Sequence, residues 1–158
     1  MIKAIMNGCN GKMGQVISAI CKEDPQIEIV AGVDLYDGIK NDYPVFPNIS
    51  VCDVAADVII DFSNAKAVDD LLVYSVDKQI PVVLCTTGLS EEQLKKVDEA
   101  SKKVAVLKSA NMSLGINMLM ELLKRAATIL APAGFDMEIV EKHHNQKLDA
   151  PSGTALAL

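Results

Sequence analysis

The chain has 158 residues, of which 50% are hydrophobic and 23% are charged, the composition of an ordinary soluble globular protein. The formal net charge of −6 argues against a nucleic-acid or anionic-membrane surface, because such surfaces need clustered Lys and Arg. No segment approaches the roughly 18 consecutive apolar residues of a membrane span, and the N-terminus is strand-like rather than a signal peptide, so we expect a cytoplasmic protein.

Short apolar runs alternate with amphipathic stretches, which is typical of βαβ units in an α/β fold with a doubly wound, Rossmann-type parallel sheet. Ser90 begins a capping box with Gln93, so the helix that follows it has the best-defined start. The predicted elements, in chain order, are strand Ile2–Met6, helix Lys12–Lys22, strand Ile27–Val33, loop Tyr36–Asn48, strand Asp57–Asp61, helix Ala65–Asp77, strand Pro81–Cys85, helix Ser90–Lys102, strand Val104–Leu107, helix Ser113–Leu130, strand Met137–Glu141 and a helical turn from Ala155 to Leu158.

The four cysteines are widely spaced along the sequence, and no two of them form a C-x-x-C pair. This spacing favours neither a zinc site nor a disulfide framework. We therefore expect free thiols, no bound metal and a reducing compartment for Cys9, Cys21, Cys52 and Cys85.

Three glycines follow the first predicted strand directly, with the spacing G-x-x-G-x-x-G at Gly8, Gly11 and Gly14. Glycines at this point let the backbone turn tightly and approach a pyrophosphate, which the free N–H groups of the next helix can bind. The simpler interpretation is an ordinary glycine-containing turn between a strand and a helix. The candidate cofactor residues in this turn are Gly8, Cys9, Asn10, Gly11, Lys12 and Met13.

Asp34 ends the second predicted strand, where a carboxylate can accept hydrogen bonds from a ribose diol. The alternative is a solvated carboxylate at a strand end. Leu35 follows it, at the place where Arg or Lys would pair with a 2′-phosphate. We therefore favour NAD(H) and leave NADP(H) open.

Polar segments follow three later strands, at the sheet edge where open α/β sheets bind ligands. These segments are Asp61–Asn64, Cys85–Gly88 and Ser109–Met112. Together they are expected to line a crevice for the nicotinamide. Each is also explained as a turn or a helix cap, and we expect Ser63 to be a cap as well.

The segment from Glu141 to Thr154 concentrates groups that transfer protons and bind anions. It contains the only two histidines, His143 and His144, followed by Lys147 and a Ser152-Gly153-Thr154 turn. Imidazole exchanges protons near neutral pH, and the ammonium and the turn can bind carboxylates. The segment therefore suits a dianionic substrate that is protonated during reaction. The alternative for a single histidine is a structural or surface residue.

Tyr74 and Lys78 have the Tyr-x-x-x-Lys spacing of short-chain dehydrogenases. They fall in a predicted crossover helix, earlier in the chain than that family places them. We interpret the spacing as chance.

The segment from Glu141 to Thr154 resembles the signature of the dihydrodipicolinate reductase family, and Gly8–Gly14, Asp61–Ser63, Cys85–Gly88 and Ser109–Met112 are similar to its other motifs in the same order. The resemblance implies NADH- or NADPH-dependent reduction of a cyclic imine dicarboxylate in lysine and diaminopimelate biosynthesis. It implies that His143 is the acid and Lys147 the essential lysine, and that His144, Gly153 and Thr154 bind substrate. It implies cofactor contacts from Gly8 to Met13 and from Asp34, Cys85, Thr86, Thr87, Ser109, Ala110, Asn111 and Met112.

Members of that family continue beyond the Ser-Gly-Thr turn, complete a second α/β domain and assemble as homotetramers. By this resemblance we expect a dinucleotide-binding domain over residues 1–131 and the beginning of a substrate-binding and tetramerisation domain over 132–158. We also expect the 158-residue chain to be inactive alone. Reduction of the substrate by the purified chain at full-length rates would contradict this.

Two other functions stay open at this point. One is a non-catalytic module that binds a dinucleotide and signals redox state to a partner. The other is a short-chain dehydrogenase that uses Tyr74 and Lys78. A proton donor at His143 has no purpose in a sensor, so the histidine distinguishes the first of these from a reductase.

Overall fold

The computed structural model describes residues 1–143, 145 and 150–158. The chain forms two compact units, Met1–Ser109 and Ala110–Leu158. This division precedes the long helix that we had grouped with the first domain. Assignment of residues 1–131 to dinucleotide binding stays a prediction.

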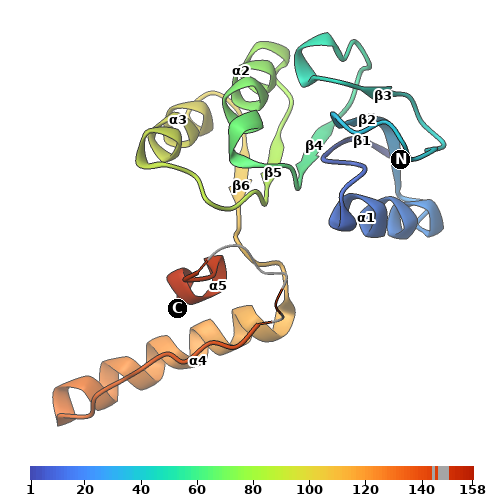
Figure 1. Ribbon diagram of the computed structural model, residues 1–158. Coiled ribbons are helices and arrows are strands. Elements are labelled where there is room, and N and C mark those ends of the chain that lie inside the picture. The colour runs from blue at the N-terminus through green and yellow to red at the C-terminus, as the bar shows by residue number, and fades with distance from the viewer. Residues whose placement is uncertain (144, 146–149) are drawn as a thin grey trace. The chain divides into compact units, whose positions relative to one another are not determined.

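The first unit is built on a six-stranded parallel sheet with the strand order β3-β2-β1-β4-β5-β6 (Figure 1). This is the order of a doubly wound Rossmann-type sheet, so the predicted fold class is confirmed. The winding reverses between β1 and β4, where such sheets hold their ligands. The elements are β1 Ile2–Asn7, α1 Lys12–Glu23, β2 Ile27–Val33, β3 Val45–Phe46, η1 Ile49–Val51, β4 Val58–Asp61, η2 Ala65–Ala67, α2 Val68–Lys78, β5 Val82–Leu84, α3 Glu91–Ser101 and β6 Val106–Lys108.

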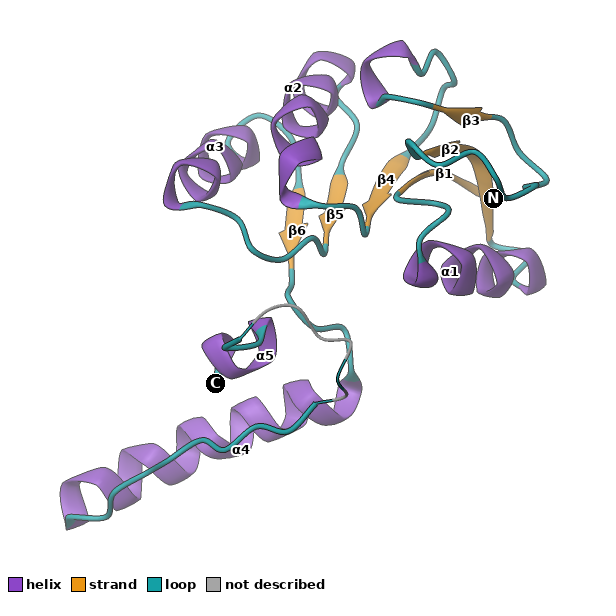
Figure 2. Ribbon diagram, viewed as in Figure 1, coloured by secondary structure: helices purple, strands orange, loops and turns teal. Residues whose placement is uncertain are grey.

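An apolar layer lies on each face of the sheet, one formed with α2 and α3 and the other with α1. Figure 2 shows these helices in purple and the strands in orange. Successive side chains of a strand point to opposite faces, so Ile5 packs with Leu71 of α2 and Val97 of α3, while Met6 packs with Cys21 of α1. Complete burial of such a side chain contributes about 1.5–3 kcal/mol. The layers hold β1 and β4 at the centre of the sheet.

Strand β3 lies inside the segment that we had predicted as loop. The loop prediction followed from Pro44 and Pro47, and at Val45–Phe46 it is wrong. The ladder is closed by donors from the neighbouring strand: the N–H of Gly32 donates to the Pro44 carbonyl at 2.9 Å, and the N–H of Asp34 donates to the Phe46 carbonyl at 3.0 Å. Since Pro44 acts only as an acceptor, its missing N–H costs nothing at this edge.

The capping box at the start of α3 is confirmed. The Gln93 N–H donates to Ser90 Oγ at 3.2 Å, and the Ser90 N–H donates to Gln93 Oε1 at 3.1 Å. We expect Ser90→Ala to lower the free energy of unfolding by about 1 kcal/mol, measured by urea denaturation. The exposed Lys95→Ala on the same helix is the control, and an equal loss in both variants would contradict a capping role.

The second unit contains α4 Leu114–Leu130, η3 Ala131–Ala133 and α5 Gly153–Ala157. After η3 the chain reverses and runs back as an extended segment (Figure 1). The predicted strand Met137–Glu141 is wrong, because in the described part of this unit no other segment forms a ladder with it. Of the helices described, none has the length and apolar character needed to cross a membrane.

Candidate functional site

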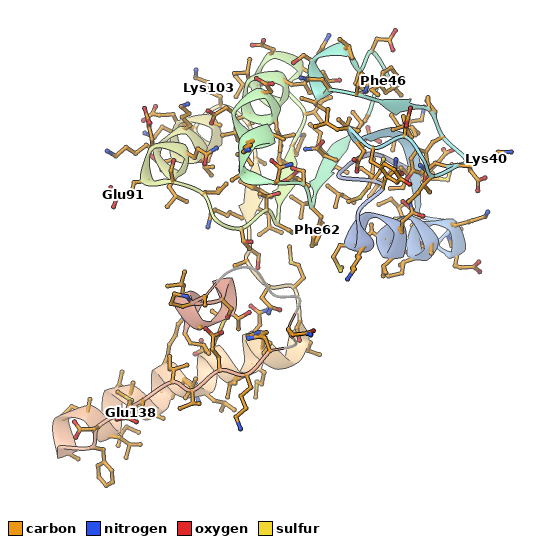
Figure 3. All side chains as sticks on the ribbon, viewed as in Figure 1. Lys40, Phe46, Phe62, Glu91, Lys103 and Glu138 are labelled. Carbon is orange, nitrogen blue, oxygen red and sulfur yellow. The ribbon has the colours of Figure 1, made fainter. Side chains whose placement is uncertain are left out.

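A cleft of about 850 Å³ opens in the first unit, at the carboxyl ends of β1, β2 and β4. Its volume lies in the range of small-molecule and cofactor sites. Phe62, labelled in Figure 3, follows β4 directly and lines the cleft. The other lining residues are Asn7, Gly8, Gly11, Val33, Asp34, Leu35, Pro47, Asn48, Ile49, Ser63, Asn64, Ala65, Lys66, Ala67 and Asp70.

Different structural constraints favour glycine at the three glycine positions of the first turn. Gly8 has φ +81°, and a Cβ there would lie 2.5 Å from the Phe62 carbonyl oxygen. A Cβ on Gly14 would collide with the Gly8 carbonyl, so packing fixes both positions. Gly11 has an ordinary φ of −72°, and its nearest neighbour for a Cβ is the Gly8 carbonyl oxygen at 3.3 Å. This contact is tight but less severe than those at Gly8 and Gly14, and Gly11 also lines the cleft at the N-cap of α1, where a close ligand would be a second reason for glycine.

Asp34 lines the same cleft and is more than a solvated carboxylate. Its Oδ2 accepts from the Asn10 N–H at 2.9 Å, and its Oδ1 accepts from the Tyr36 N–H at 3.0 Å. It therefore joins the glycine-rich turn to the loop after β2. Each carboxylate oxygen can accept a second hydrogen bond, which leaves capacity for hydroxyl donors. Leu35 beside it is 86% exposed.

The remaining candidates in the turn do not line the cleft. Cys9 and Asn10 are buried behind it. The Asn10 side chain donates to the Tyr36 carbonyl, and its Oδ1 accepts from Asn41 at 2.7 Å. Lys12 and Met13 are exposed in the first turn of α1. Cys9 and Asn10 thus support the turn rather than face a ligand.

A buried polar cluster joins the carboxyl ends of β1, β4 and β5. Asp61 is fully buried, and its Oδ1 accepts from Asn7 Nδ2 at 2.7 Å and from Ser63 Oγ at 2.6 Å. Thr86 Oγ1 lies 3.4 Å from Ser63 Oγ. Ser63 is therefore not the cap that we expected. Asn64 caps η2, because its side chain accepts from the Lys66 N–H at 3.0 Å.

The Cys85–Gly88 segment begins beside this cluster but does not line the cleft. Cys85 and Thr86 are buried and Thr87 is exposed. Of the two predicted nicotinamide segments that lie wholly in the first unit, Phe62–Asn64 lines the cleft and Cys85–Gly88 does not.

Burial makes two cysteines of these loops poor nucleophiles. It raises the pKa of Cys9 and of Cys85 to about 11, with Asp34 adding to the effect on Cys9 and Asp61 to that on Cys85. We expect iodoacetamide to leave both unmodified in the folded chain at pH 8 and at pH 9, as read by peptide mass spectrometry, because only thiolate reacts. Modification at the rate of the denatured chain would contradict this.

The same two pKa values make stability depend on pH. The folded state holds these protons more tightly than the unfolded chain does, so the free energy of unfolding falls as pH rises from the ordinary thiol range towards 11.

The second unit brings several candidate substrate residues together. Asn111 Nδ2 donates to Thr154 Oγ1 at 2.9 Å, and Ser152 caps α5, which begins at Gly153. His143 Nδ1 lies 3.5 Å from Glu141 Oε2. Ala110 and Met112 belong to this unit, and Ser109, whose N–H donates to the Leu84 carbonyl at 3.1 Å, ends the first. His144 and Lys147 lie outside the described residues.

Tyr74 is unsuited to act as a general acid. It is buried in α2, and its hydroxyl donates to the Cys52 carbonyl at 2.9 Å. Burial, with a further contribution from Cys52, raises the pKa of Tyr74 to about 12. The alternative of a short-chain dehydrogenase is therefore contradicted, and the interpretation as chance spacing is supported.

Sequence reasoning missed the wall of the cleft that is formed by Asn48, Lys66 and Asp70. Lys66 is the one cationic side chain among the lining residues, all of which lie in the described part of the chain. Asn48 and Asp70 line the same wall, and Asn48 Nδ2 donates to Asp70 Oδ2 at 3.4 Å. The position of this segment in the chain was the signal that could have indicated the wall. Residues 62–67 follow β4, the strand at which the winding of the sheet reverses.

Family models of dihydrodipicolinate reductase match nearly the whole chain, the N-terminal model over residues 2–112 and the C-terminal model over residues 115–158. The chain belongs to the dihydrodipicolinate reductase family. The 4-hydroxy-tetrahydrodipicolinate reductase of Clostridium novyi (strain NT) is 54% identical over 158 residues, which are 100% of this chain and 62% of the relative. That of Caldanaerobacter subterraneus subsp. tengcongensis is also 54% identical, over 162 residues. The chain thus spans 62% of the length of these relatives.

A solved member of the family has the same fold. The dipicolinate-bound dihydrodipicolinate reductase from Paenisporosarcina sp. TG-14 is similar with a TM-score of 0.77 and 30% identity, over 99% of this chain and 63% of that one. The myo-inositol 2-dehydrogenase of Lactobacillus plantarum, at 12% identity and a TM-score of 0.61, shows the likeness of fold alone.

Proposed function

We propose that this member of the dihydrodipicolinate reductase family acts in the reduction of 4-hydroxy-tetrahydrodipicolinate, or the imine derived from it, with NADH or NADPH as reductant. Residues 1–131 bind the dinucleotide and residues 132–158 contribute to the substrate site. The observation that carries the proposal is the cleft in which Gly8, Gly11 and Asp34 meet at the reversal of the sheet. We place the activity in the cytoplasm and in lysine biosynthesis, with a homotetramer as the assembled form.

The residues of the cleft fit a dinucleotide. Gly11 has no side chain to keep a ligand away from the N-terminus of α1, where N–H groups and the helix dipole favour a pyrophosphate. Asp34 has acceptor capacity for the ribose hydroxyls. When bound, the nicotinamide supplies the hydride.

The protein's own part in the reaction is to bind the dicarboxylate and to supply a proton. His143 gives the proton, while Lys147 adds fixed positive charge that stabilises negative charge as it develops. His144, Gly153 and Thr154 hold the carboxylates, with the hydroxyl of Thr154 fixed by Asn111. The Paenisporosarcina relative is described with dipicolinate bound, and the same class of dicarboxylate is expected here.

Turnover is the test of this function. The chain would be joined to the remaining C-terminal part of the Clostridium novyi relative, and NADH oxidation followed at 340 nm with and without 4-hydroxy-tetrahydrodipicolinate. We expect oxidation that depends on the substrate and saturates with it. A folded chimera that binds NADH but never oxidises it would support the redox-sensor alternative instead.

Asp34 is expected to govern the choice of cofactor. Asp34→Asn should weaken NADH binding about 10- to 100-fold, because one charge-assisted hydrogen bond to the ribose contributes about 1.5–3 kcal/mol. NADPH should lose less, since the carboxylate also repels a 2′-phosphate. Nicotinamide fluorescence measures both affinities, and the exposed Asp37→Asn is the control with the same change of charge. Equal losses for the two nucleotides would contradict the role in selectivity.

A further inference from the structure

Glu141 contacts both the candidate proton donor and the candidate anion-binding turn. Its Oε1 accepts from the Ser152 N–H at 3.0 Å, and its Oε2 lies 3.4 Å from the same nitrogen. The same Oε2 lies 3.5 Å from His143 Nδ1. All three residues belong to the second unit, so the arrangement does not depend on how the two units are placed.

Of these three residues, only Ser152 is buried. The Glu141 side chain is 29% exposed and that of His143 is 39% exposed, while Ser152 is 3% exposed. Hydrogen bonds to a partly buried carboxylate are stronger than those on an open surface, because water competes less for the acceptor. Catalytic hydrogen bonds are often long before the substrate binds and shorten in the complex, so 3.5 Å is a reasonable starting distance.

We propose that Glu141 is a positioning residue for the reduction. Its carboxylate accepts a hydrogen bond from Nδ1–H of His143, so that the imidazolium form keeps this proton and gives its other proton from Nε2. It also fixes Ser152 at the start of the Gly153–Thr154 turn. The proposal rests on the proposed function, because it takes His143 as the acid.

A carboxylate at position 141 can accept both of these hydrogen bonds better than an amide can. It has two acceptor oxygens and no donor, so it can serve the Ser152 N–H and the His143 Nδ1–H together. A glutamine has one acceptor oxygen and an NH₂ group, which would face one of the two donors. The hydrogen bond that one ring nitrogen makes sets the tautomer of the other, so loss of the carboxylate should change which nitrogen of His143 carries the proton.

The experiment compares the wild-type chain with Glu141→Gln and with Glu138→Gln. Glu138, labelled in Figure 3, is an exposed carboxylate on the same extended segment, and its substitution makes the same change of charge. Long-range ¹H–¹⁵N spectra report the tautomer of each imidazole, and a His143→Gln spectrum identifies the signals, because the chain has only two histidines. NADH oxidation is then measured in the chimera with the Clostridium novyi relative.

We expect the Nδ1-protonated tautomer of neutral His143 in the wild type and in Glu138→Gln, and a shift towards the Nε2-protonated form in Glu141→Gln. In the chimera, Glu141→Gln should lower kcat about 10-fold or more while KM changes less, since a misplaced proton donor affects the chemical step. The same tautomer and the same kcat in both variants would overturn the proposal. If the wild-type chimera shows no turnover, the proposed function fails, and the spectra still decide whether Glu141 holds His143.

Discussion

Replacement of His143 by glutamine should lower kcat of the chimera by about 10²- to 10⁴-fold, the usual contribution of a positioned general acid. KM for the dicarboxylate should change much less, because the loss falls on the transition state. Lys147→Gln should raise KM as well as lower kcat, since we propose that its ammonium also binds a carboxylate. Initial rates of NADH oxidation over a range of substrate concentrations measure both parameters.

Tyr74→Phe is the matched comparison for the His143 variant. It removes the hydroxyl whose hydrogen bond to the Cys52 carbonyl is buried, so it should cost about 1 kcal/mol of stability but leave turnover near normal. Unchanged turnover in His143→Gln would instead show that His143 is not the proton donor of the reaction. Loss of turnover in Tyr74→Phe, with the fold intact, would revive the short-chain dehydrogenase alternative.

Gly8→Ala should destabilise the first unit by about 2–5 kcal/mol, from the strain of a positive φ and from overpacking. The reason is local: the added Cβ would lie 2.5 Å from the Phe62 carbonyl oxygen at φ +81°. Gly11→Ala, whose Cβ would lie 3.3 Å from the Gly8 carbonyl oxygen at an ordinary φ, should cost less stability than Gly8→Ala and keep the fold, yet weaken NADH binding 10-fold or more. Thermal unfolding and nicotinamide fluorescence separate the two effects.

Gly115→Ala is the control for these glycine substitutions. Gly115 lies in the first turn of α4, and a Cβ there would have Ser113 Oγ at 3.8 Å as its nearest neighbour. We expect no loss of stability and no change in NADH affinity. If Gly11→Ala binds NADH as tightly as Gly115→Ala does, the proposal that a ligand closely approaches the turn at Gly11 is wrong.

Local sequence signals predicted the elements whose stabilising contacts lie close together in the sequence. The strand Ile27–Val33 has the predicted bounds, and the box at Ser90 and Gln93 closes within one helical turn. Strand β3 was missed because its pairing depends on donors of β2, which are distant in the sequence. The error at Met137–Glu141 has the same origin, since an apolar run becomes a strand only when another backbone pairs with it.

The residues of the candidate site also differ in whether local sequence signals could predict them. The glycine spacing and the strand-end position of Asp34 correctly placed Gly8, Gly11 and Asp34 at the cleft, because both are tied to the first two strands. The other residues predicted in the turn, Cys9, Asn10, Lys12 and Met13, do not line it. The links from Asn7 to Asp61 and to Ser63 could not be predicted, since they join residues more than 50 positions apart. Lys66 was overlooked because a lysine in a predicted helix has no local pattern that distinguishes a cleft wall from a solvated face.

We propose that the cleft beside Gly11 and Asp34 holds a nicotinamide dinucleotide. Titration of the purified chain with NADH and with NADPH, followed by nicotinamide fluorescence, tests it most directly. We predict saturable binding of at least one nucleotide, tighter for NADH, that is weakened by Gly11→Ala and by Asp34→Asn but not by Gly115→Ala or Asp37→Asn. A folded chain that binds neither nucleotide, or whose affinity is the same in all four variants, would contradict the account.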